Sequence, residues 1–239
     1  MRPDSTGRKG FGRICRVRRS SAGSRDRRSD RLAVERGWRL VSLTKSGCGA
    51  ADVLQYNVNF KRAYTECATW REASFRRAES EHPALVLVAS SRASHAVGAD
   101  GASDVTGVDA VEPWRAGMDR TLRRLAGAAG SVVLIGDTPR SDVDVPVCLS
   151  AHRDDVLAWA TPVEDAISRS WLANERDVAA ATAVGFVDPT PPWVCPSNPC
   201  PAVIGNFMVF RDEHHLTSQF SSALGRLLGD ALRARSAKP

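Results

Sequence analysis

Two short runs of consecutive apolar residues most constrain the fold of this chain. Residues 84–89 read Ala-Leu-Val-Leu-Val-Ala and residues 131–136 read Ser-Val-Val-Leu-Ile-Gly, and turn-forming residues bound both runs. A strand with one face in water alternates apolar and polar residues, whereas a strand covered on both faces is apolar throughout. We therefore predict that both runs are central strands of a parallel sheet.

Helical segments alternate with such strands along the chain. Further strands are predicted at residues 38–43 and 185–188, and a hairpin at 203–210. Apolar residues at helical spacing predict helices at residues 30–36, 60–80, 113–128, 163–183 and 217–233. Alternation of strands and helices is typical of α/β folds, so we expect a three-layer α/β/α sandwich with a parallel sheet of about four to five strands.

Charge divides the chain near residue 30. Residues 1–31 hold eleven Lys and Arg and three Asp, a net charge of +8, and the whole chain carries +6, so the remainder carries −2. We expect a disordered basic leader at 1–29, one domain at 30–235 and a tail at 236–239. A basic arm can bind nucleic acid or an anionic surface, but solvated leaders have the same composition, and no specific nucleic acid is expected. No apolar run is long enough to span a membrane, and no apolar segment typical of a secretory signal follows the first residues.

Four of the six cysteines form two local pairs, Cys48 with Cys67 and Cys195 with Cys200. Neither pair has a second Cys or His pair at the spacing of zinc ligands. Two local disulfides in an extracytoplasmic protein are one interpretation, and buried thiols in a cytosolic protein are the other. Cys15 and Cys148 have no obvious partner.

A carboxylate and an imidazole lie three residues apart near the C-terminus. Asp212 and His215 precede an amphipathic helix, so both side chains can point to one place. A serine esterase or acyltransferase needs this pair, because an imidazole takes the serine proton and a carboxylate orients the imidazole. The same spacing also occurs by chance in loops of no catalytic role.

Six segments of the chain, taken in order, match a known family. They include Val-Val-Leu-Ile-Gly-Asp-Thr-Pro at 132–139 and Arg-Asp-Glu-His-His-Leu-Thr at 211–217, the latter preceded by Gly-Asn at 205–206. The other matching segments are residues 37–48, 145–149, 187–190, and 194–196 with 200–201. Together they resemble the SGNH (GDSL-like) hydrolase superfamily, and more narrowly the SGNH domain that follows acyltransferase-3 membrane proteins of bacteria, which O-acylate surface polysaccharides.

The resemblance implies roles for individual residues. Asp212 and His215 take the place of the catalytic acid and base, and Gly47 that of the glycine whose backbone N–H binds the oxyanion. The family's oxyanion asparagine corresponds to residues 90–92, Ser-Ser-Arg, so a hydroxyl, with Ser91 as the candidate, or the side chain of Arg92 would serve as the second donor. Relatives carry a second cysteine where this chain has Trp159, so the resemblance implies that Cys148 is a free thiol. No metal or organic cofactor is implied.

The nucleophile is the main departure from the family. In relatives, a strand ending in Gly-Asp-Ser stands about 15–20 residues before the equivalent of Gly37, and such a strand end exposes a nucleophilic serine. The corresponding residues 18–25 read Arg-Arg-Ser-Ser-Ala-Gly-Ser-Arg, without a preceding apolar strand. The nucleophile is therefore unknown, and Ser20, Ser21 and Ser24 are the serines present in this window. The first strand is expected to be lost, and a different gene start or reading frame would explain residues 1–29.

The resemblance also implies a function with defined partners. It implies an O-acyltransferase or esterase domain, truncated and inactive without its serine, that acts on acetyl or other acyl groups of cell-surface polysaccharide. Its partners are an acyl donor, a glycan acceptor and the membrane acyltransferase module of relatives, at the extracytoplasmic face of the envelope. The alternative is a non-catalytic SGNH-fold module that binds carbohydrate or docks a partner.

Overall fold

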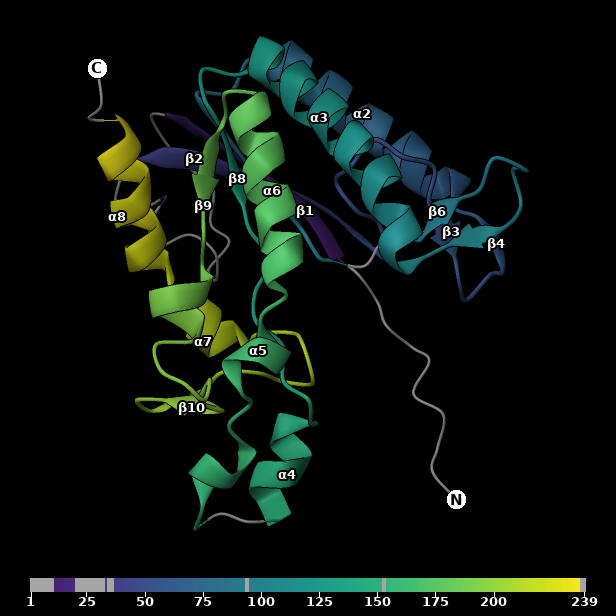
Figure 1. The fold of residues 1–239 in the computed structure, drawn as a ribbon. Helices are drawn as coiled ribbons and strands as arrows, with labels where there is room; N and C mark the ends of the chain where they lie inside the picture. Colours follow the sequence, from purple (N-terminus) through teal and green to yellow (C-terminus); the bar gives the residue numbers. More distant parts are fainter. Residues whose placement is uncertain (1–10, 20–32, 34–36, 93–94, 152–153, 237–239) are drawn as a thin grey trace. The chain divides into compact units, whose positions relative to one another are not determined.

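A five-stranded sheet forms the centre of the α/β fold (Figure 1). In this computed structural model, residues 11–19, 33, 37–92, 95–151 and 154–236 are described. The strands stand in the order β2-β1-β5-β8-β9. Their bounds are Phe11–Arg19 for β1, Trp38–Ser46 for β2, Leu85–Ser90 for β5, Val132–Ile135 for β8 and Gly185–Val187 for β9.

The strands predicted from apolar runs are confirmed. β5 and β8 pair in parallel, with Val86 opposite Val132 and Ala89 opposite Ile135, and β9 completes a parallel three-strand part. Val88 and Leu134 are fully buried, as expected for strands with two covered faces. The predicted α/β fold class is therefore confirmed.

β1 corrects the expectation that residues 11–19 are disordered. This strand lies between β2 and β5 and runs antiparallel to β5, with Gly12 opposite Ser90 and Val17 opposite Leu85. Backbone hydrogen bonds to a neighbouring strand do not depend on side-chain type, which is why periodicity did not reveal it. The sheet is thus mixed rather than wholly parallel. The remaining residues of the expected leader and the helix expected at 30–36 lie outside the described residues, apart from residue 33.

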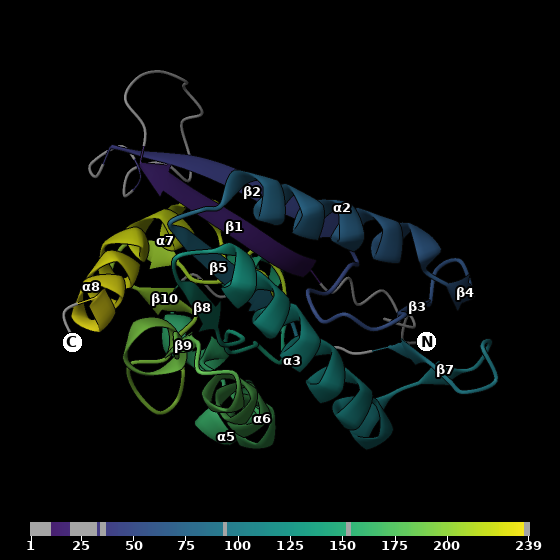
Figure 2. The same ribbon diagram turned by 90° about the horizontal axis from the view of Figure 1, so that it is seen from above.

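Three long helices are joined to one another by polar contacts. Figures 1 and 2 show α2 (Thr65–Glu81) alongside α3 (Val111–Ala128), and α3 in turn contacts α6 (Arg169–Ala181). Arg124 of α3 forms ion pairs of 2.6 Å with both Glu72 and Glu79 of α2. Arg115 of α3 donates to Asn174 of α6 at 2.7 Å. The apolar side chains of Met118, Leu122 and Phe75 on these helices are buried, and each such side chain stabilises the fold by about 1.5–3 kcal/mol.

The chain divides into two compact units. The first comprises Leu40–Ile135 and Asn174–Phe186 together with the chain up to Arg18, so it holds most of the sheet and α2 and α3. The second comprises Arg19–Arg39, Gly136–Ala173 and Val187–Pro239. No helix within the described ranges combines the length and the apolar character needed to cross a membrane.

The second unit has its own core and short elements. Val145, Val194, Val209, Phe210 and Phe220 are buried together in it. Its helical elements are α4 (Val145–Ala151), η2 (Val156–Trp159), α5 (Val163–Ala166), η3 (Thr190–Val194), α7 (Ser218–Ala223) and α8 (Gly225–Ser236). The hairpin predicted at 203–210 is present as β10 (Val203–Ile204) and β11 (Phe207–Met208).

Two predicted helices are each split in two. The helix expected at 163–183 is interrupted because Ile167 adopts an extended conformation, which ends α5 before α6 begins. The helix expected at 217–233 changes from α7 to α8 at Leu224. Apolar spacing continues across both breaks, so the pattern alone could not locate them.

The first unit carries further short elements near the sheet. They are the strand pairs β3 (Tyr56–Asn57) with β4 (Arg62–Ala63) and β6 (Ala96–Val97) with β7 (Asp104–Val105), and the turn η1 (Gly107–Ala110). The helix predicted from residue 60 begins only at Thr65, because β3 and β4 take up the preceding residues. It ends where His82 takes a left-handed conformation ahead of Pro83, as expected from the sequence.

Candidate active site

A closed loop of the second unit holds the predicted catalytic pair. The backbone of Phe210 pairs with that of Leu216, and the Arg211 N–H donates to the His215 carbonyl at 2.8 Å. Thr217 ends the loop, because its hydroxyl donates to the Met208 carbonyl at 2.7 Å and accepts the Phe220 N–H that begins α7. Backbone hydrogen bonds across the base of the loop and the side-chain hydroxyl of Thr217 therefore fix its conformation.

Asp212 organises the turn and the imidazole at once. Its Oδ1 accepts the backbone N–H groups of His214 and His215, at 2.9 and 2.7 Å. Its Oδ2 lies 2.6 Å from Nδ1 of His215. With the Nδ1 proton directed at the carboxylate, Nε2 is the ring nitrogen that accepts a proton. Three-residue spacing brings the two groups together, as the sequence predicts.

The surroundings keep Asp212 ionised. Partial burial is the largest single influence and raises the pKa of Asp212, but the two backbone N–H groups and the His215 imidazole together outweigh it. The net result is a pKa of Asp212 below its ordinary value. The side chain of Asp212 is 36 % exposed and that of His215 is 17 % exposed, so the pair is half-buried. A carboxylate that stays charged beside an imidazole stabilises the imidazolium formed during proton transfer.

His214 lies against His215. The two rings have centroids 4.1 Å apart, and Nδ1 of His214 is 3.7 Å from Oδ1 of Asp212. Asp212, His214 and His215 offer ligand atoms within 4.8 Å of one another, so the group could hold a metal ion. The oxygens of Asp212 already accept three N–H groups, and a cation would have to replace the imidazole proton. The arrangement therefore suits a proton relay better than a metal site.

The proposed oxyanion glycine lies in a tied loop of the first unit. Gly47 follows β2 directly and has φ +65°, a conformation that favours glycine. The next residue, Cys48, forms a disulfide with Cys67 of α2, which confirms the first predicted pairing. The Cys195–Cys200 disulfide of the second unit is also present, and Cys148 is a free thiol.

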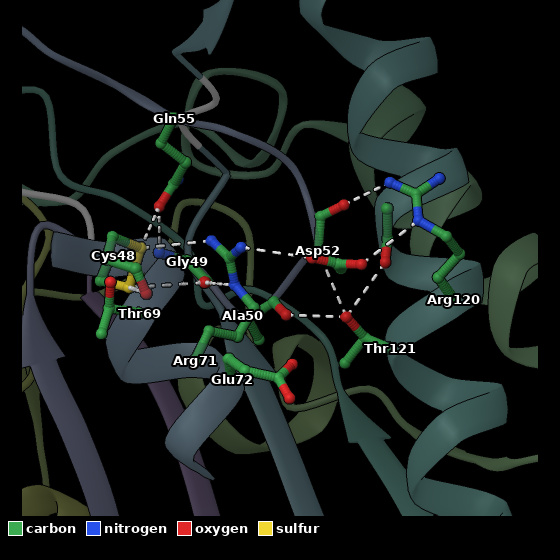
Figure 3. Close-up of polar contacts among 12 residues, drawn as sticks. Cys48, Gly49, Ala50, Asp52, Gln55, Thr69, Arg71, Glu72, Arg120 and Thr121 are labelled. Carbon is green, nitrogen blue, oxygen red and sulfur yellow. Dashed lines mark hydrogen bonds and ion pairs between the residues drawn. A yellow bond between two sulfur atoms is a disulfide. The ribbon is translucent and has the colours of Figure 1, made fainter. Parts of the chain in front are cut away.

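A buried arginine holds the same loop (Figure 3). Arg71 of α2 is 2 % exposed, and its Nε donates to the Gly49 carbonyl at 3.3 Å while its Nη1 lies 3.6 Å from Asp52. Burial is the main influence on the guanidinium and lowers the pKa of Arg71, and the Asp52 carboxylate offsets part of that effect. The Asp52 backbone N–H donates to the Thr121 hydroxyl at 3.0 Å, which ties the loop to α3 as well. Since a disulfide and both helices hold it, the loop has a defined conformation.

Ser91 stands where the resemblance places the second oxyanion donor. It directly follows β5 and is half-buried. Gln55 did not emerge from the sequence patterns, yet the structure brings it to the same strand end. The Gln55 Oε1 accepts the Gly49 N–H at 2.8 Å, and a Cβ added to Gly49 would lie 3.0 Å from the Gln55 amide nitrogen and 3.4 Å from the Ser90 hydroxyl. A single polar residue in a turn-rich segment carries no signal of this placement.

No nucleophile is assigned among the described residues. Ser20, Ser21 and Ser24 lie outside them. Because β1 is antiparallel to β5, the C-terminal end of β1 lies at the amino end of β5. The C-terminal ends of β1 and β5 therefore lie on opposite sides of the sheet along the strand direction.

An Asp–His pair that follows the last strand of an α/β sheet is an arrangement that serine esterases and acyltransferases use, but the fold alone does not establish an activity. The family comparison makes the assignment specific. The description "SGNH domain (fused to AT3 domains)" matches residues 27–230, so the chain belongs to this family of SGNH domains. The resemblance drawn from the six segments is thereby confirmed.

A solved structure supports the fold. The periplasmic domain of a lipopolysaccharide acetyltransferase from Salmonella ser. Paratyphi A superimposes with a TM-score of 0.52 at 13 % sequence identity. The match covers 78 % of this chain and 69 % of that one. At this identity the likeness establishes the fold and not the activity. A comparison with curated proteins gave no match.

Proposed function

We propose that this chain is an SGNH-type O-acyltransferase or esterase domain that acts on acyl groups of cell-surface polysaccharide, with acetyl as the expected group. The observation that carries the proposal is the relay of Asp212 and His215, with Nδ1 of the imidazole 2.6 Å from the carboxylate. Membership of a family fused to AT3 domains supports the acyl chemistry and a membrane acyltransferase module as partner.

The proposed reaction uses the relay twice. A serine hydroxyl attacks the acyl carbonyl while Nε2 of His215 takes its proton, and the leaving group then takes that proton from the imidazolium. A sugar hydroxyl or water, deprotonated by the same nitrogen, attacks the acyl-enzyme and releases the serine. Gly47 and Ser91 are the proposed oxyanion donors. Asp212 orients the ring and stabilises its charged form in both steps.

We place the proposed activity outside the cytoplasm. Two disulfides fit an oxidising compartment, and the solved neighbour is described as a periplasmic domain. The proposed substrates are an acyl donor and a glycan acceptor.

One observation favours a second candidate, a non-catalytic module that binds carbohydrate or docks a partner. The antiparallel course of β1 does not bring its C-terminal end to the carboxyl end of β5. An SGNH fold without a nucleophile would keep the loop of residues 210–216 as a structural feature only.

A fluorophosphonate probe separates the two candidates. It modifies an activated serine, so we expect labelling of the folded protein that His215→Ala abolishes, and peptide mapping then identifies the nucleophile. His95→Ala is the matched control, because His95 forms a separate His–Asp pair with Asp104 at 3.0 Å. Labelling that survives His215→Ala, or no labelling of the folded protein, would favour the non-catalytic module.

A further inference from the structure

The loop that carries the catalytic pair is held from outside by a neighbouring segment of the second unit. The Ser141 N–H donates to the Glu213 carbonyl at 2.7 Å, and Glu213 lies between Asp212 and His215 in the turn. Ser141 is 8 % exposed, so this bond is sheltered from water. The position of the turn therefore depends on the position of residue 141.

A buried threonine fixes the segment beside Ser141. The Thr161 hydroxyl donates to Oδ1 of Asp142 at 2.9 Å and lies 3.4 Å from the Asp142 backbone nitrogen. Thr161 is 3 % exposed. The Arg140 N–H, on the other side of Ser141, donates to the Ala166 carbonyl at 3.0 Å. Residues 140–142 are thus tied at both ends, and their middle residue holds the catalytic turn.

Thr161 is in turn held by a disulfide loop. Its backbone exchanges two hydrogen bonds with Cys200, of 3.0 and 2.8 Å. Cys200 is linked to Cys195, and both cysteines are buried with Ala166. A continuous series of bonds therefore runs from the Cys195–Cys200 disulfide through Thr161 and Ser141 to the turn of Asp212 and His215.

We propose that Thr161 is a positioning residue for the catalytic turn and that it couples the turn to the Cys195–Cys200 disulfide. The inference rests on the proposed function for its effect on catalysis, and on the bonds of the second unit for its effect on the turn. Loss of the hydroxyl, or of the disulfide, weakens the hold on Asp142, and the Glu213 carbonyl bonded to the adjacent Ser141 can then shift. A displaced turn misplaces the imidazole, and misplacements of about 1 Å cost about 10²-fold in rate.

The test compares Thr161→Val with a matched change elsewhere. Thr182→Val also removes a buried threonine hydroxyl, but that hydroxyl donates only to carbonyls of its own helix, at 2.7 and 3.2 Å. Hydrogen exchange of the peptide covering residues 210–217 is measured in the full chain. We expect faster exchange of the His214 and His215 amides in Thr161→Val and in Cys195→Ala/Cys200→Ala. We expect these amides to exchange at the wild-type rate in Thr182→Val. In Thr161→Ser, which keeps the hydroxyl, we expect their exchange to return to the wild-type rate.

The combined variant tests the coupling itself. If the disulfide acts through Thr161, adding Thr161→Val to Cys195→Ala/Cys200→Ala produces little further acceleration of exchange. The proposal would be overturned if the effects of Thr161→Val and of the cysteine replacements on the exchange rate multiply in the combined variant. Unchanged exchange in Thr161→Val, or equal acceleration in Thr182→Val, would also overturn it.

Activity then tests the proposed function separately. We expect kcat for hydrolysis of 4-nitrophenyl acetate to fall by about tenfold or more in Thr161→Val with little change in KM. A wild-type protein without activity would contradict the proposed function, while the exchange result would still decide the role of Thr161. Faster exchange with unchanged kcat would overturn the claim that the turn must be positioned for catalysis.

Discussion

Replacing Asp212 by asparagine tests the relay most sharply, because the structure dictates how the new side chain must lie. The Asp212 Oδ1 accepts two backbone N–H groups, at 2.9 and 2.7 Å, and only the oxygen of an amide can replace it there. The NH₂ group of the introduced amide then faces Nδ1 of His215, where Oδ2 of the carboxylate lies at 2.6 Å in the wild type. That ring nitrogen must accept a hydrogen bond, so the imidazole proton moves to Nε2.

The wrong tautomer removes the base while leaving the turn folded. In a serine triad the same exchange of carboxylate for amide lowers kcat by about 10⁴-fold, equivalent to about 5 kcal/mol in activation free energy. Two hydrogen bonds to a charged oxygen become hydrogen bonds to a neutral one, so the free energy of unfolding should fall by only about 1–3 kcal/mol. This variant should therefore lose most of its activity while it retains most of its stability.

Two measurements check this prediction. Ester hydrolysis gives kcat, and nitrogen-15 NMR of the histidine rings reports which nitrogen of His215 carries the proton. We expect Nδ1–H in the wild type and Nε2–H in Asp212→Asn. A variant that keeps the Nδ1–H tautomer, or that loses less than about tenfold in kcat, would refute the reasoning.

The remaining predictions concern stability. Loop-closure entropy gives about 3 kcal/mol for the Cys48–Cys67 disulfide, with a sequence separation of 19, and about 2 kcal/mol for Cys195–Cys200, with a separation of 5. Urea unfolding of the two double-alanine variants should show the larger loss for the first, and the reverse order would contradict this estimate. Arg124 holds the pKa of Glu72 down to about 2, below the value of about 4.3 expected in the unfolded chain. This ion pair therefore stabilises the protein above about pH 4.3, and its contribution is lost as pH falls toward about 2. Over that pH range, the urea midpoint at low salt should fall less in Arg124→Gln than in the wild-type protein. An equal fall in both proteins would show that the ion pair contributes nothing to stability.

Much of the fold could be predicted because its signals are local. Continuous apolar runs predicted β5 and β8, and apolar residues at helical spacing predicted α3. The relay could be predicted as well, because a three-residue spacing joins Asp212 to His215 within one turn. The two disulfides follow the same logic, since each joins cysteines that lie close in the sequence.

Other features depend on partners far away in the chain. β1 was not predicted because its arginine-rich sequence has no strand periodicity, and only its pairing with β5 makes it a strand. The breaks at Ile167 and Leu224 were missed because apolar spacing continues through them. Gln55 was missed because its place in the structure depends on the hydrogen bond that its carboxamide accepts from the Gly49 N–H, which no sequence pattern indicates.

The sequence by itself determined the α/β class, the family and the proximity of Asp212 and His215, because apolar periodicity and short spacings act over a few residues. The tertiary structure alone decided the direction of β1 and the hydrogen bonds that join Ser141 to the turn of Asp212 and His215 and Thr161 to Asp142. Those features consist largely of backbone hydrogen bonds between distant segments. Almost any residue can make such bonds, so they leave no mark in the amino-acid pattern.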